Sequence, residues 1–182
     1  MINLNDRITI KTERLMINEL SVDDLEFFMH IEQIAENKKY EMSGVLEQTS
    51  IIEKFNKFLK GRSQLPHRGA IMFIVTLNDH PIGYISLRCN FEKTKEWEMG
   101  YSFLRSHFRQ GFAYESIQSV INFAFNELKI HKLMAFVHAG NTPSIKLLEK
   151  LKMKQEGHLR EARLIDGEWA DEKVFSLLQL EA

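Results

Sequence analysis

The run Trp97-Glu-Met-Gly-Tyr-Ser-Phe-Leu104 is followed by Arg105-Ser-His-Phe-Arg-Gln-Gly-Phe-Ala113 and then by a patterned segment from Tyr114 to Leu128. Large apolar side chains occupy every second position of the first run, which is the pattern of a strand. The last segment repeats apolar residues at the i, i+3, i+4, i+7 spacing of one helix face: Ile117, Val120, Ile121, Ala124, Phe125 and Leu128. Together they predict a strand, a short turn and an amphipathic helix.

The predicted turn has features of an anion-binding site. The start of a helix leaves its first N–H groups unpaired and carries partial positive charge, which suits a phosphate group. Gly111 and Ala113 would allow a ligand to approach closely, and Arg105 and Arg109 add full charges. Many strand-to-helix turns with one glycine only redirect the chain, so the turn alone leaves both interpretations open.

The composition indicates one ordinary globular domain spanning residues 1–182. The net charge of −1 does not suggest a binder of nucleic acids or membrane surfaces. The single cysteine, Cys89, excludes an internal disulfide, and no Cys/His spacing indicates a metal site. Because neither a signal peptide nor an apolar run of about 20 residues is evident, we expect a cytoplasmic protein.

Local patterns predict the remaining elements. Strands are expected over residues 8–18, 70–77, 82–89, 133–138, 154–162 and 173–180, and helices starting near Ser21, Ser50 and Asn141. Residues 37–48 fit no element, and Asp166-Gly-Glu-Trp169 falls in a polar loop. The run 70–77 is apolar almost throughout, which is typical of a strand covered on both faces. The order predicts an α/β (α+β) domain with a mixed sheet of about seven strands and about four helices.

This arrangement resembles the GNAT superfamily of acyl-CoA-dependent N-acetyltransferases, and most of all its Rim-type branch, which acetylates N-terminal amines of ribosomal proteins. The resemblance covers nearly the whole chain. It is carried by Lys11-Thr-Glu-Arg-Leu15, Glu98-Met-Gly-Tyr101, Gln110-Gly-Phe-Ala-Tyr-Glu115, Asn141-Thr-Pro-Ser-Ile-Lys-Leu-Leu-Glu-Lys150 and Glu156-Gly157. Each motif is weak alone, but five in this order are specific.

The resemblance implies acetyl-CoA as cofactor. Its diphosphate would bind the glycine turn, and its pantetheine would bind the edge of the central strand, which is expected to part from the strand over residues 133–137. Unpaired N–H groups at that edge would serve as oxyanion donors. The residues expected to bind acetyl-CoA are Tyr101, Phe103, Leu104, Arg105, Arg109, Gln110, Gly111, Phe112, Ala113, Tyr114, Asn141 and Ser144.

Two positions depart from the family pattern. Phe108 replaces the polar residue that usually opens the phosphate turn, so side-chain binding there is less expected than backbone binding. Lys152-Met153 replaces a Gly-Phe pair after the helix that starts near Asn141. A lysine in the left-handed conformation would cost about 1 kcal/mol, unless the helix ends in another way.

Two residues are candidates for catalysis. Glu98 is the candidate base, because it lies on the strand that should border the acetyl group. It could instead make a fixed hydrogen bond or ion pair within the sheet. Ser144 is the candidate for returning a proton to the departing thiol, although its position is equally explained by helix capping.

The acceptor must be a deprotonated amine. At pH 7, deprotonation costs about 4.6 kcal/mol for lysine but only about 1–1.4 kcal/mol for an α-amine. A weak base therefore suffices for a polypeptide N-terminus, the leading hypothesis, with a ribosomal protein as possible partner. A small amine (polyamine, aminoglycoside or amino acid) and a non-catalytic acyl-CoA-binding module stay open, as does the choice between monomer and homo-oligomer. Expected acceptor contacts are Glu41, Arg160 and Trp169, and Glu161, Arg163 and Asp166 are further plausible contacts.

Overall fold

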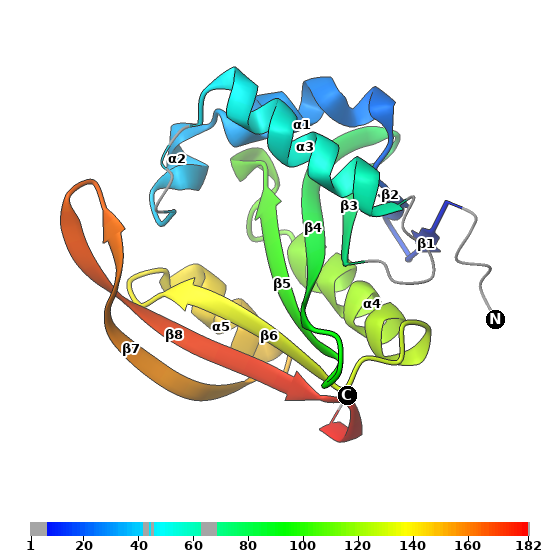
Figure 1. The fold of residues 1–182 in the computed structure, drawn as a ribbon. Helices are drawn as coiled ribbons and strands as arrows, with labels where there is room; N and C mark the ends of the chain where they lie inside the picture. Colours follow the sequence, from blue (N-terminus) through cyan, green and yellow to red (C-terminus); the bar gives the residue numbers. More distant parts are fainter. Residues whose placement is uncertain (1–6, 42–43, 45, 63–68, 182) are drawn as a thin grey trace.

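The structure, a computed structural model, describes residues 7–41, 44, 46–62 and 69–181. These residues form an eight-stranded mixed sheet in the order β1-β2-β3-β4-β5-β6-β8-β7 (Figure 1). The strands are β1 Thr9–Lys11, β2 Met16–Glu19, β3 Ala70–Leu77, β4 His80–Phe91, β5 Glu96–Phe103, β6 Lys132–His138, β7 Lys154–Ile165 and β8 Glu168–Leu178. The helices are α1 Leu25–Glu32, α2 Ala35–Lys38, α3 Gln48–Arg62, α4 Phe112–Asn126 and α5 Thr142–Lys150, with 3₁₀ turns at Val22–Asp24, Arg105–His107 and Gln179–Glu181.

The predicted α/β class and mixed sheet are confirmed, with differences at both ends of the chain. The single strand expected over residues 8–18 is a hairpin, in which the Thr12 N–H donates to the Leu15 carbonyl at 3.0 Å and β1 pairs with β2. The expected late loop is shorter than predicted. Asp166 and Gly167, both with positive φ, form a two-residue hairpin turn, so Trp169 lies in β8. Residues 42–43 and 45 of the unassigned segment lie outside the described residues.

The sheet is covered on both faces. Alternate residues of β3 enter two cores: Ile71, Phe73 and Val75 belong to the core on the α4 side of the sheet, whereas Met72 and Ile74 belong to the core formed with α1 and α3. This confirms the strand predicted to be covered on both sides. In the described residues no helix is long and apolar enough to span a membrane.

The main irregularity of the sheet lies between β5 and β6. These parallel strands pair only from Glu96 to Glu98, opposite Lys132 to Met134. Beyond that point β6 continues beside β8 as far as His138, while β5 follows β4 (Figure 1). The predicted parting of these two strands is therefore confirmed.

Candidate active site

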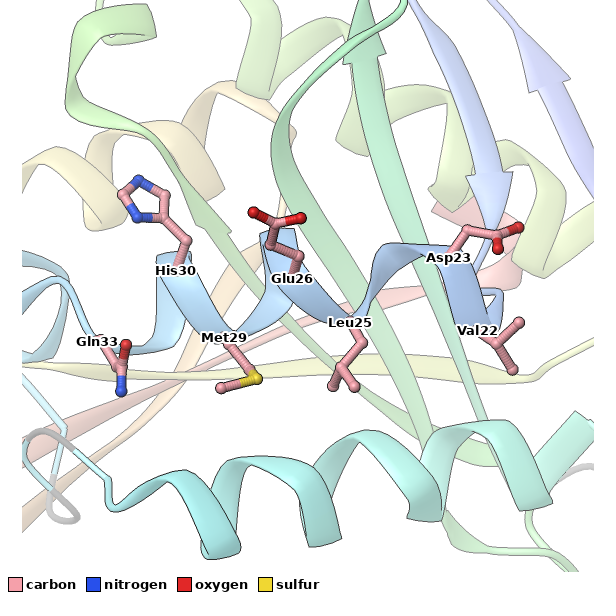
Figure 2. Close-up of a pocket in the computed structure, with 7 residues that line it drawn as sticks. All are labelled: Val22, Asp23, Leu25, Glu26, Met29, His30 and Gln33. Carbon is pink, nitrogen blue, oxygen red and sulfur yellow. The ribbon is translucent and has the colours of Figure 1, made fainter.

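A cleft of about 380 Å³ lies where β5 leaves β6. Strands β4, β5 and β6, helices α3 and α5, and the segment around α2 all contribute to its walls. It brings together five residues predicted for the site from distant parts of the chain: Glu41, Glu98, Tyr101, Asn141 and Ser144. A larger, open depression of about 540 Å³ is lined only by residues between Val22 and Gln33 (Figure 2). All residues that line this depression come from one continuous segment of the chain, so the cleft between β5 and β6 is the better candidate for the active site.

The β5 side of the cleft has a free backbone edge. The Leu104 N–H donates to the Ile82 carbonyl of β4 at 2.8 Å. Because successive backbone groups of a strand point to opposite sides, those of Tyr101 and Phe103 face the gap toward β6, beyond the last β5–β6 pair at Glu98 and Met134. The Phe103 carbonyl there accepts a hydrogen bond from the Asn37 amide at 3.2 Å.

Two hydroxyl groups meet inside the cleft. The Tyr101 hydroxyl oxygen lies 2.6 Å from the Ser144 hydroxyl oxygen. Burial raises the pKa of Tyr101 to about 12, although the bond to Ser144 partly offsets the rise. Tyr101 therefore keeps its proton near neutral pH and can donate it to Ser144, which leaves the Ser144 proton available to a third group. Asn141 caps α5, since its side-chain oxygen accepts the Ser144 N–H at 3.3 Å.

Glu98 points to the opposite face of the sheet from Tyr101, as alternation along β5 requires. Its carboxylate lies 2.9 Å from the Arg88 guanidinium and 3.4 Å from the Asn90 amide. The ion pair foreseen as the alternative role is thus present. The Glu98 side chain nevertheless remains 25% exposed at the cleft wall, where it can reach a water molecule or a ligand.

The glycine turn leads directly into α4, which begins at Phe112, two residues before the patterned segment suggested. Gly111 caps the helix with φ 86°, and Arg109 also has a positive φ of 59°, a conformation that costs a non-glycine residue about 1 kcal/mol. The Glu115 N–H makes the first helical bond, to the Gly111 carbonyl at 3.0 Å. The N–H groups of Phe112, Ala113 and Tyr114 precede it and have no partner within the helix.

The surroundings of this turn fit an anionic ligand. Arg105, Arg109 and Gln110 are exposed around it, as is Phe108, and Gly111 offers no side chain that would block approach. The diphosphate of coenzyme A could therefore be held by backbone N–H groups with guanidinium groups nearby.

A buried charge network beside the cleft was missed by the sequence analysis. Glu32 is fully buried and contacts Lys38 at 3.0 Å, Lys54 at 2.8 Å and the Tyr84 hydroxyl at 2.6 Å. Burial alone would raise the pKa of Glu32, but the charges of Lys54 and Lys38 lower it below its usual value. Lys38 also holds Glu41 at 2.9 Å. A signal was available, because Glu32 continues the buried stripe of α1 at the i+4 position from Phe28.

The acceptor contacts predicted on the late hairpin lie apart from the cleft. Trp169 pairs with Leu164 in the hairpin and is 63% exposed, and Arg160 is exposed. Arg163, another plausible contact from the same hairpin, does line the cleft and forms an ion pair with Glu172. The register shifts between Leu159 and Arg163, so simple alternation could not identify which arginine faces inward.

Comparison with known proteins agrees with this geometry. An acetyltransferase (GNAT) domain model matches residues 14–154. The chain is 30% identical over 178 residues to the uncharacterized N-acetyltransferase p20 of Bacillus licheniformis, covering 95% of this chain and 97% of the relative. A GNAT-family acetyltransferase structure from Bacillus anthracis is 28% identical, with TM-score 0.81 over 96% of this chain and 100% of that one.

A spermidine N-acetyltransferase from Vibrio cholerae, solved with CoA and spermine, has the same fold at 23% identity. Its TM-score is 0.83 over 93% of this chain and 98% of that one. The domain match spans well over half of the sequence, and the relatives align along almost its full length. The chain therefore belongs to the GNAT family of acetyltransferases.

Proposed function

We propose that this acetyltransferase uses acetyl-CoA to acetylate a primary amine, by direct attack of the amine on the thioester in a ternary complex. The observation that carries the proposal is the end of β5–β6 pairing at Glu98 and Met134, which opens a cleft along β5, the strand that leads into the glycine turn. Bound acetyl-CoA supplies the activated acetyl group. The turn at Gly111 binds its diphosphate, and the free edge of β5 binds its pantetheine.

The two candidate catalytic residues, Glu98 and Ser144, lie on opposite faces of the sheet, next to the gap between β5 and β6. The N–H group of Tyr101, on the β5 edge beyond the last pair with β6, donates to the carbonyl oxygen as negative charge develops on it. Glu98 accepts the amine proton through water on the face toward α1 and α3. Ser144, hydrogen-bonded to Tyr101 at 2.6 Å, gives a proton to the departing thiolate.

A polypeptide N-terminal α-amine is the proposed acceptor. Any carboxylate is a weak base, and a weak base such as Glu98, held in place by Arg88, suffices for an amine whose deprotonation costs only about 1–1.4 kcal/mol at pH 7. The carboxylates lining the described cleft, Glu41 and Glu98, each have a cationic partner, Lys38 or Arg88. A polycationic acceptor would need unpaired carboxylates, so the charge balance favours the N-terminus.

Two relatives whose names state an acceptor match less than half of the chain in sequence. The ribosomal protein uS5-alanine N-acetyltransferase of Escherichia coli is 30% identical over 79 residues, and a Vibrio cholerae spermidine N(1)-acetyltransferase is 33% identical over 73 residues. The first agrees with the Rim-type acceptor proposed for this chain. The second makes polyamine acetylation the competing hypothesis.

An acceptor panel tests the proposal. Labelled acetyl-CoA is supplied with a peptide that has a free N-terminal alanine, with the same peptide N-terminally blocked but carrying an internal lysine, and with spermidine. We expect label on the free N-terminus alone. Label on spermidine alone would support the competing hypothesis, and binding of acetyl-CoA without transfer to any amine would identify a non-catalytic module.

A further inference from the structure

The first hairpin of the chain is fastened to the glycine turn by Arg14, which lies between β1 and β2. Its guanidinium donates to the Gln110 carbonyl at 3.1 Å and lies 4.5 Å from the centre of the Phe112 ring. The same group contacts the Glu115 carboxylate at 2.7 Å through Nε and at 2.6 Å through Nη2. The Arg14 side chain thus contacts the glycine turn at Gln110, the first residue of α4 at Phe112, and Glu115 one turn further along the helix.

The remaining bonds to Glu115 strengthen this attachment. Its second carboxylate oxygen accepts the Thr12 hydroxyl at 2.6 Å and the Arg14 N–H at 3.0 Å. Burial would raise the pKa of Glu115, but the hydrogen bonds from Thr12 and Arg14 and the charge of Arg14 lower it, so the carboxylate stays ionised. The hairpin turn itself is closed by the Thr12 hydroxyl, which accepts the Leu15 N–H at 2.9 Å.

This attachment bears on anion binding in two ways. First, Arg14 engages the Gln110 carbonyl in a turn that carries two positive-φ residues, Arg109 and Gly111, and so fixes which backbone groups face outward. Second, Glu115 places a negative charge in the first turn of α4, where it would repel a diphosphate. Two nitrogens of the Arg14 guanidinium, Nε and Nη2, contact the same Glu115 oxygen, Oε2, and the positive charge of Arg14 offsets the carboxylate charge.

We propose that Arg14 is a positioning residue for coenzyme A: it holds the turn Arg109–Ala113 in the conformation that presents its N–H groups to the diphosphate. The inference rests on the proposed function. It also assigns a role to the Lys11–Leu15 motif, which the catalytic scheme leaves without one.

The test measures KM and kcat for acetyl-CoA and for S-acetylpantetheine, which lacks the diphosphate. For Arg14→Gln we expect KM for acetyl-CoA to rise about tenfold with kcat within twofold of wild type, and kcat/KM for S-acetylpantetheine to be unchanged. Arg14→Lys should fail to restore KM, because an ammonium cannot reproduce the planar fork that binds Gln110 and Glu115 together. Arg7→Gln is the matched control, since Arg7 is equally exposed in the same region but pairs with Asp24.

These measurements distinguish a failure of the proposed function from a failure of the role assigned to Arg14. If kcat/KM of the wild type is the same for S-acetylpantetheine and for acetyl-CoA, the turn at Gly111 does not bind the diphosphate, and this part of the proposed function is wrong. If wild type discriminates but Arg14→Gln leaves KM for acetyl-CoA unchanged, or raises both KM values equally, the role of Arg14 is wrong. Rescue by Arg14→Lys would indicate a direct contact with phosphate and would also overturn it. Should Arg14→Gln not fold, Arg14→Lys must still raise KM for acetyl-CoA selectively, and an unchanged value would refute the proposal.

Discussion

The Arg88 guanidinium lies 2.9 Å from the Glu98 carboxylate, and the two residues are direct partners in the β4–β5 register. The pair fixes the carboxylate at the cleft wall just where β5 loses its pairing with β6. An ion pair and a catalytic base are therefore compatible in one residue, since the pair orients the carboxylate while leaving its side chain 25% exposed.

Replacing Glu98 by glutamine tests the base. We expect kcat to fall about a hundredfold, the usual contribution of a general base. The free energy of unfolding should change by less than about 1 kcal/mol, because exposed ion pairs contribute little. Arg88→Gln is the control and should reduce kcat much less. A wild-type kcat for Glu98→Gln, measured with saturating substrates, would remove Glu98 from the mechanism.

Replacing Ser144 by alanine removes the hydroxyl that faces Tyr101 but retains the backbone N–H that Asn141 caps. We expect kcat to fall about a hundredfold, at the low end of acid–base effects, with the Kd for coenzyme A and the Tm unchanged. Thr142→Ala in the same helical turn, whose side chain is exposed, is the matched control. If both variants have the wild-type kcat, Ser144 has no catalytic role and contributes only to the start of α5.

The Tyr101 hydroxyl makes stability depend on pH in alkaline solution. Its pKa is raised to about 12 by burial, so the folded state keeps a proton that the unfolded chain loses near pH 10. The stabilisation is complete below pH 10 and is lost as the pH rises to about 12, by up to about 1.4 kcal/mol per pH unit. Chemical denaturation of Tyr101→Phe should show a shallower decline over this interval. An identical slope in wild type would contradict the raised pKa.

Lys152 ends α5 in the left-handed conformation, with φ 62°. The Met153 N–H donates to the Leu148 carbonyl at 3.1 Å and the Lys152 N–H to the Glu149 carbonyl at 2.9 Å, which is the Schellman arrangement. Lys152→Gly should therefore raise the free energy of unfolding by roughly 0.5–1 kcal/mol. Lys146→Gly, inside the same helix, should lower it by about 1 kcal/mol. Equal effects of the two substitutions would show that backbone conformation at Lys152 is not responsible.

Secondary structure was predicted best from the sequence where a periodic pattern is compatible with only one type of element. The alternation of β5, the apolar run of β3 and the stripe of α4 all form the expected elements. The family pattern also led to the left-handed position at Lys152. Its cost was foreseen, although the choice between strain and another helix end needed the structure.

Prediction was poorer where several segments meet. The Glu32 network joins three helices and β4 at one carboxylate, which no local pattern describes. The strand expected over residues 8–18 gave no clear sign of the turn at Thr12, because that turn is closed by a side-chain hydroxyl and held by Glu115 from another element. The bulge before Arg163 similarly breaks the alternation from which its orientation could be inferred.

A crystal structure of the protein with coenzyme A tests the central claim most directly. The account predicts the diphosphate within hydrogen-bond distance of the N–H groups of Phe112 and Ala113, with the pantetheine between β5 and β6. A diphosphate bound elsewhere, or β5 and β6 paired beyond Glu98 and Met134 in the complex, would contradict it.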